Sequence, residues 1–132
     1  MTVTAGPPAD LFSIAAAVMV AIVAALHVYF LVLEMFLWRT PFGLRTFRMS
    51  KEVADLSAVL AGNQGLYNGF LAAGLLWALV AYGVVAGRPI LIFFLLCVIA
   101  AGVYGAATVS RRIALIQALP AAIALALVWL AR

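Results

Sequence analysis

Two ionisable side chains lie inside the first long apolar segment of this sequence. His27 and Glu34 are seven residues apart, which is about two turns of an α-helix, so a helix would present both on one face. Ionisable groups inside a membrane-spanning helix cost several kcal/mol unless they are paired or hydrated, and they therefore mark candidate sites. A carboxylate and an imidazole on one face suit proton exchange, the binding of a cation or polar lipid, or acid/base chemistry on an apolar substrate.

The later apolar segments carry further polar side chains that could bind a ligand. They are Asn63, Gln64, Tyr67, Asn68, Tyr104 and Gln117. Measured from the ends that share one side of the membrane, Glu34, Asn68, Tyr104 and Gln117 all lie roughly 6 to 9 Å deep at the rise of an α-helix. We predict that these groups face inward and satisfy each other around a cavity open toward the cytoplasm.

Each candidate also has a structural interpretation. Amide and phenol groups in membrane helices often hydrogen-bond neighbouring helices, and a lone histidine such as His27 can be a satisfied core residue. Glu34 could form an ion pair with Arg39 or Arg111 at the interface. One histidine and one glutamate do not supply the three convergent ligands of a metal centre, so no metal site is predicted. No motif in the sequence identifies a cofactor.

The composition requires a lipid environment. A chain of 132 residues with 69% hydrophobic and 9% charged residues cannot hide its apolar side chains in one water-soluble core. The net charge of +4 comes from basic residues in short connections between apolar runs. These residues indicate topology, so the lipid bilayer is the expected partner and nucleic acid is not. Cys97 is the only cysteine, which excludes an intramolecular disulfide.

Four apolar runs are long enough, or nearly so, to cross a bilayer, which takes about 20 residues. The predicted helices cover about residues 11–38, 61–86, 89–110 and 113–130. Very short connections separate the last three, so consecutive helices must be antiparallel neighbours. The expected fold is all-α, a single transmembrane domain over residues 1–132 built as an up-and-down four-helix bundle. A short interfacial helical segment, capped by Ser50, is expected before the second span.

The basic residues also predict an orientation. The first and third connections hold six of them: Arg39, Arg45, Arg48, Lys51, Arg111 and Arg112. The opposite side holds two, Arg88 and Arg132. The positive-inside rule then places the connection 39–60 in the cytoplasm and both termini outside. Gly65, Gly69 and Ala73 form a small-residue surface on which a homodimer could assemble.

Several runs of residues resemble a known family. They are His27-Val-Tyr-Phe-Leu-Val-Leu-Glu34-Met-Phe-Leu-Trp38, Asn63-Gln-Gly-Leu-Tyr-Asn-Gly69-Phe-Leu-Ala-Ala-Gly74, Ala101-Gly-Val-Tyr104-Gly and Gln117-Ala-Leu-Pro120. Together they look like the bacterial membrane proteins grouped as domain of unknown function 1304. The resemblance covers almost the whole chain and implies a small four-helix protein of the bacterial cytoplasmic (inner) membrane. It implies no activity, substrate or cofactor.

Three classes of function fit these observations. The first is binding or transport of a small molecule or ion, with Glu34 exchanging protons and the amides and phenols shaping a pocket in the cytoplasmic half. The second is a membrane-embedded enzyme that uses Glu34 and His27 as acid and base on a lipid-like substrate. The third is a non-catalytic subunit of a membrane complex. We predict the first, and the sequence identifies neither the ligand nor the oligomeric state.

Overall fold

The computed structural model describes residues 10–132, and every regular element in that range is helical. The elements are α1 (Leu11–Met35), α2 (Pro41–Phe47), α3 (Lys51–Ala86), α4 (Arg88–Thr108), the π-helix η1 (Ala114–Ala118) and α5 (Leu119–Leu130). Three of them, α1, α3 and α4, are long and apolar enough to cross a membrane. The C-terminal helix, Ala114–Leu130, is apolar but shorter.

Polar caps fix where three of these helices begin. The Asp10 carboxylate accepts a hydrogen bond from the Ser13 backbone N–H at 2.8 Å, and Thr40 Oγ1 accepts one from the Gly43 N–H at the start of α2. Ser50 Oγ accepts one from the Val53 N–H at 3.3 Å, so the predicted cap at Ser50 is confirmed. Side-chain caps of this kind satisfy N–H groups that have no partner inside the helix.

Two predicted boundaries differ from the structure. The first helix ends at Met35 instead of Trp38, because the chain turns there and starts α2 at Pro41. The segment after Ser50 is not a separate interfacial helix, because it continues without a break into the second apolar run. The resulting α3 has 36 residues and is about 54 Å long, well beyond the roughly 30 Å of a bilayer core. If α3 crosses a bilayer, part of it projects beyond the hydrocarbon.

The far end of α3 depends on one glycine conformation. Gly83 has φ 73° and ψ −177°, which side-chain-bearing residues rarely adopt. This residue kinks the last turn of α3 before the chain reverses into α4 at Gly87 and Arg88. The kink therefore sets the direction in which α4 leaves α3.

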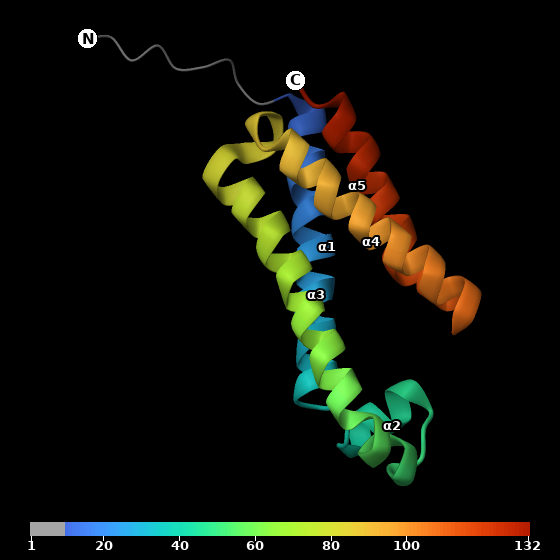
Figure 1. Ribbon diagram of the computed structural model, residues 1–132. Helices are drawn as coiled ribbons and strands as arrows, with labels where there is room; N and C mark the ends of the chain where they lie inside the picture. Colours follow the sequence, from blue (N-terminus) through green and yellow to red (C-terminus); the bar gives the residue numbers. More distant parts are fainter. Residues whose placement is uncertain (1–9) are drawn as a thin grey trace.

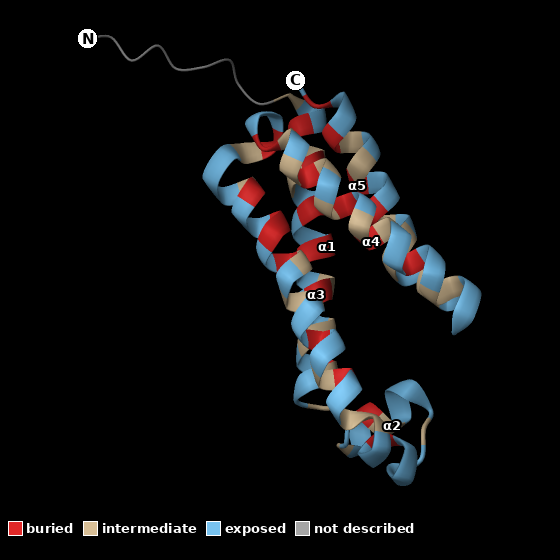
Figure 2. Ribbon diagram, in the orientation of Figure 1, coloured by how far each residue is buried: buried red, intermediate tan, exposed pale blue. Residues whose placement is uncertain are grey.

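The helices pack as two pairs that separate toward one end. α1 lies along α3, α5 packs on α1, and α4 packs on both α3 and α5. The shared core includes Ala16, Val20, Leu75, Leu95 and Ala124, all fully buried, at the end of the molecule opposite α2 (Figures 1 and 2). Toward α2, the ribbons of α4 and α5 diverge from α1 and α3 (Figure 1).

Burial along α4 and η1 shows the same separation. The last buried residue of α4 is Gly102, and η1 has none. Gly102 packs against η1 so closely that an added Cβ would lie 2.8 Å from the Ala118 nitrogen. The C-terminal half of α4 and η1 therefore pack against each other, and their outer faces are exposed. We refer to these two segments together as the arm.

The π-helix lies directly before Pro120. Proline has no N–H, so the usual i to i−4 bond to the Ile116 carbonyl cannot form, as the sequence indicates. The helix widens there instead, and the Leu119 N–H bonds the carbonyl of Ala114, five residues earlier. The predicted fourth helix over 113–130 is thus one apolar helix with a π turn at its start.

The contact between α1 and α3 yields a stability prediction. A Cβ on Gly65 would lie 2.8 Å from Met35 Cγ and 3.0 Å from Glu34 Cβ, whereas one on Gly62 would meet nothing within 4 Å. We expect Gly65→Ala to be less stable than Gly62→Ala by about 1–3 kcal/mol, because only the first overpacks the interface and helix propensity cancels between the two. Reversible unfolding in mixed detergent micelles, followed by circular dichroism, measures the difference. Equal stability of the two variants would contradict this packing.

Candidate functional site

The structure brings Glu34 of α1 and Asn68 of α3 into direct contact. Asn68 Nδ2 donates a hydrogen bond to Glu34 Oε2 at 2.8 Å, and both side chains are half-buried. The bond is within reach because Gly65 and Gly69 let the two helices approach closely, with Leu31, Glu34 and Met35 packed over the missing side chains. A hydrogen bond to a carboxylate is stronger than one between neutral groups.

Glu34 has no cationic partner in the part of the chain that the structure describes. Arg39, one of the two predicted partners, lies 3.9 Å from the Asp55 carboxylate instead. Trp38 Nε1, next along the chain, donates to Ser57 Oγ at 3.1 Å, so this end of α1 is tied to the first turns of α3. Among the described residues, the recorded partner of Glu34 is therefore a neutral amide, and the structural ion pair is not formed.

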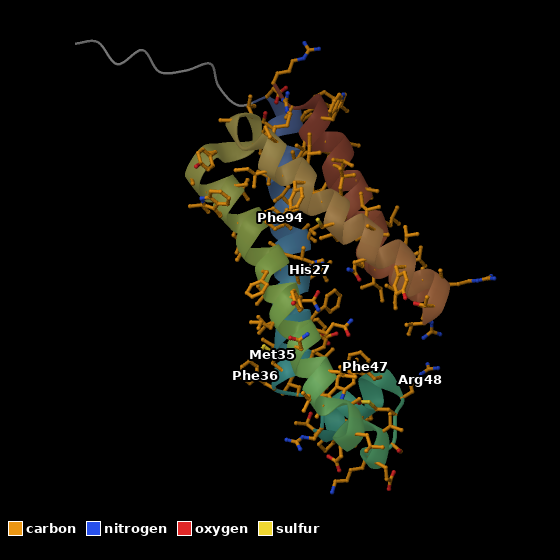
Figure 3. All side chains as sticks on the ribbon, in the orientation of Figure 1. His27, Met35, Phe36, Phe47, Arg48 and Phe94 are labelled. Carbon is orange, nitrogen blue, oxygen red and sulfur yellow. The ribbon has the colours of Figure 1, made fainter. Side chains whose placement is uncertain are left out.

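His27 lies deeper on the same helix, at the junction of the two helix pairs (Figure 3). Its side chain is 1% exposed, and Nδ1 lies 2.8 Å from the carbonyl oxygen of Val23. A carbonyl can only accept, so Nδ1 carries the proton, and Nε2 of the neutral ring is an acceptor. Nε2 is buried and has no hydrogen-bond partner among the described residues. Phe30, which the sequence analysis did not single out, packs edge-on against the imidazole at 5.5 Å between ring centres.

Glu34 and His27 face the same side of α1, as predicted. Seven residues rotate a helix by two turns less about 20°, so the Glu34 side chain lies almost directly below the buried His27. Burial decreases between them, because Phe30, Leu31 and Glu34 are all half-buried. The Glu34–Asn68 pair therefore faces the side of α1 from which α4 and α5 have diverged, one to two turns beyond the end of the four-helix core.

Two glutamines lie on helix faces that continue this core. Gln64 is one turn before Asn68, on the α3 face that later carries the buried Leu75 and Ala78. Gln117 is one turn before Ala121, the first of the buried residues Ala121, Ala124 and Val128 of α5. Gln64 is exposed and Gln117 is half-buried. Both glutamines thus lie on the faces of their helices that are buried further along, and neither has a recorded hydrogen bond to Glu34.

The other three candidates lie elsewhere. Tyr104 is 73% exposed, because it is two residues from Gly102 and so points away from the face on which α4 meets η1. Asn63 and Tyr67 are both exposed and lie on the side of α3 opposite Gly65. Tyr67 packs edge-on against Phe70. Of the predicted ring of four inward polar groups at one depth, the structure therefore joins only Glu34 and Asn68, while Gln117 is half-buried in η1.

The small-residue surface of α3 is divided between two sides. Gly65 and Gly69 pack against α1 within the same chain, and a Cβ on Gly69 would lie 2.5 Å from Leu31 Cδ1. Ala73 is exposed. The glycines therefore serve the α1–α3 contact, and the homodimer stays a prediction.

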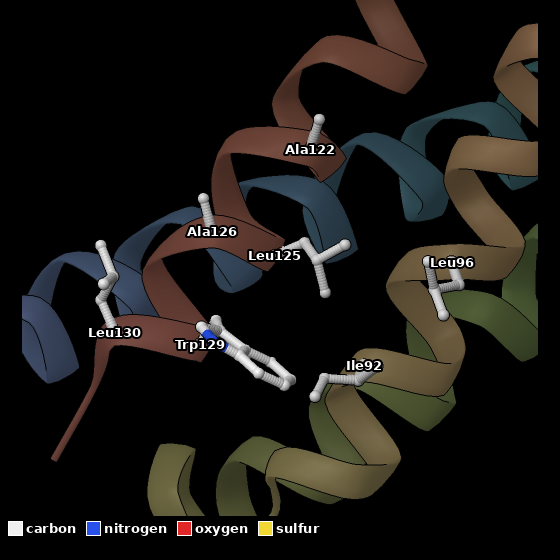
Figure 4. A pocket seen from close by; sticks show the side chains of 7 residues that line it. All are labelled: Ile92, Leu96, Ala122, Leu125, Ala126, Trp129 and Leu130. Atoms are coloured by element: carbon white, nitrogen blue, oxygen red, sulfur yellow. The ribbon is translucent and has the colours of Figure 1, made fainter.

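Two grooves elsewhere on the molecule lack this chemistry. One lies between α4 and α5 and is lined by apolar side chains and Trp129, as Figure 4 shows. The other lies near the kink at Gly83, with Ser13, Tyr82 and Arg132 among its lining residues. Neither contains Glu34 or His27. Within residues 10–132, no group of three or more His, Cys, Asp or Glu side chains is placed to hold a metal ion.

Comparisons with known proteins agree with the resemblance noted from the sequence. Residues 21–129 match the family model described as "Protein of unknown function (DUF1304)". The chain is 34% identical over 98 residues to the uncharacterized protein YpaA of Lactococcus lactis subsp. lactis (strain IL1403), covering 73% of this chain and 81% of that protein. No solved structure matches. The site residues from His27 to Gln117 all lie within the matched range, and the chain belongs to the DUF1304 family.

Proposed function

We propose that this protein binds, and by exchanging protons at Glu34 transports, a small cation or a small molecule with a cationic group. The observation that carries the proposal is the Glu34 carboxylate, which lies within an apolar helix, is half-buried, and has a neutral amide as its recorded partner. A structural ion pair would already be neutralised by a basic residue. Glu34 instead keeps its charge available for a proton or an ammonium group.

The surroundings of Glu34 support binding from one side only. Toward α2 the helix pairs separate, whereas beyond His27 the core residues Val23, Val20 and Ala16 are buried and apolar. Because Glu34 itself is half-buried, a ligand that approaches from the α2 end would reach it without crossing the packed half of the bundle. Transport would require the diverged arm of α4 and η1 to change position relative to α1 and α3.

The acid/base enzyme hypothesis has less support. His27 is committed to the Val23 carbonyl through Nδ1, and no contact between His27 and Glu34 is recorded. At the rise of an α-helix, seven residues separate their backbones by about 10 Å, too far for direct proton transfer between them.

The proposed arrangement in the membrane has four spans, with the C-terminal helix 114–130 crossing as the fourth and the α2 end in the cytoplasm of a bacterial inner membrane. The exposed basic residues Arg39, Arg45, Arg48 and Lys51 gather around α2, which supports this orientation.

Single-cysteine variants test the orientation. In a Cys97→Ser background we expect Thr46→Cys to react with a membrane-impermeant maleimide only in inside-out vesicles, and Ala86→Cys only in intact spheroplasts, because both side chains are exposed, Thr46 in α2 and Ala86 at the far end of α3. The reverse pattern would contradict the proposed topology, and labelling of both sites from one side would contradict the number of spans between them.

Amine binding tests the proposed function. Titration of hexylammonium chloride into the protein in nanodiscs, with empty nanodiscs as the baseline, should show saturable binding. Glu34→Gln should weaken this binding roughly 10- to 100-fold, the range expected when one charge-assisted contact is lost. Glu52→Gln is the matched control, because Glu52 is exposed in the first turn of α3, and it should leave affinity unchanged. Equal affinity in wild type and Glu34→Gln, or no binding by wild type, would overturn the proposal.

A further inference from the structure

His27 carries a polar atom that nothing in the described structure satisfies. The Val23 carbonyl fixes which nitrogen of the ring holds the proton, and the lone pair of Nε2 is left buried without a donor. A buried hydrogen-bond acceptor without a donor lowers the stability of the fold, unless a ligand or water supplies the donor. In histidines that bind metals, a hydrogen bond from Nδ1 to a backbone carbonyl likewise leaves Nε2 as the nitrogen that binds.

The position of His27 shows where such a donor would come from. Toward the opposite end of the molecule, the buried residues of α1 are apolar as far as Ser13, so α1 offers no nearby polar side chain on that side. Toward α2, the next turn of the same face holds Phe30 and Leu31, both half-buried, followed by Glu34. On this face of α1, burial therefore decreases from His27 toward the Glu34–Asn68 pair.

We infer that His27 is the inner contact of the ligand site, and that its ligands carry a cationic group for Glu34 and a neutral hydrogen-bond donor for His27 Nε2, joined by a short apolar chain. This inference rests on the proposed function. The apolar chain would lie along Leu31 and Phe30. The inner donor must be neutral, such as a hydroxyl, because a second ammonium without a counter-charge is far too costly at that depth.

The spacing of the two contacts sets the length of the ligand. Glu34 and His27 are separated by about 10 Å along the helix. Hydrogen bonds of about 3 Å at both ends leave roughly 4 Å between the two polar atoms of the ligand if both bonds lie along the helix axis, and about 10 Å if both lie across it, so a chain of about two to six methylene groups fits. Linear ω-amino alcohols of this length have the required chemistry. 5-Aminopentan-1-ol and hexylamine form a matched pair, since the second replaces the hydroxyl with a methyl group of similar size.

Calorimetric titration of the full chain in nanodiscs tests the inference. Wild type should bind 5-aminopentan-1-ol roughly three- to tenfold more tightly than hexylamine, once the different partitioning of the two into empty nanodiscs is subtracted, because the hydroxyl gains one hydrogen bond. The preference should decline for shorter and longer amino alcohols. His27→Leu should remove this preference, and saturable binding of hexylamine by the variant, which requires Glu34, shows that the variant is folded.

A second variant separates loss of the acceptor from loss of packing. His27→Gln retains an acceptor oxygen and should keep part of the preference for the amino alcohol, whereas His27→Leu should keep none. If wild type binds both compounds equally, or if His27→Leu retains the preference, His27 is not a ligand contact, although Glu34 could still bind amines. If hexylamine itself does not bind wild type, the proposed function and this inference both fail.

Discussion

The close approach of α1 to α3 is the contact on which the site depends. Gly65 and Gly69 have no side chains, so Leu31, Glu34 and Met35 of α1 pack directly over the α3 backbone. Only at this separation can Asn68, beside the glycines, donate to the Glu34 carboxylate at 2.8 Å. A wider spacing would leave the carboxylate without its amide partner inside an apolar helix, where an unpaired acidic group is strongly disfavoured. The glycines thus have a functional consequence as well as a packing role.

A second feature, the end of the four-helix core at His27, determines which way the site opens. Buried apolar residues of α1, α3, α4 and α5 pack together at the end opposite α2, and the tight contact of Gly102 with Ala118 keeps the C-terminal part of α4 attached to η1. As Figure 3 shows, that arm leaves α1 and α3 near His27, which is polar and fully buried. Pro120 prevents a regular α-helix at the start of the C-terminal segment, and the resulting π turn at Ala114–Ala118 is part of the same arm. π turns of this kind often occur at functional sites.

Sequence reasoning identified the depth of the polar groups better than their direction. Glu34, Asn68 and His27 stand out because ionisable and amide side chains are rare in apolar helices, and the structure confirms the shared face of His27 and Glu34. The depth of Tyr104 predicts that it faces inward, and this prediction is wrong. Every face of α4 is apolar enough to be the buried one, and the contact of Gly102 with Ala118 determines which face packs against η1. The predicted start of the second span at residue 61 also differs from the structure, in which α3 begins at Lys51. No proline interrupts residues 51–86, and the boundary was inferred from polarity alone.

Solid-state NMR of the uniformly ¹³C,¹⁵N-labelled protein in lipid bilayers tests the central claim most directly, because it detects the partner of the Glu34 carboxylate without changing a residue. A through-space correlation between the Glu34 side-chain carboxyl carbon and the Asn68 side-chain nitrogen is the predicted result. A correlation from that carbon to the guanidinium nitrogens of Arg39 or Arg111 instead would contradict the account, since Glu34 would then be neutralised within the protein and unavailable to a ligand.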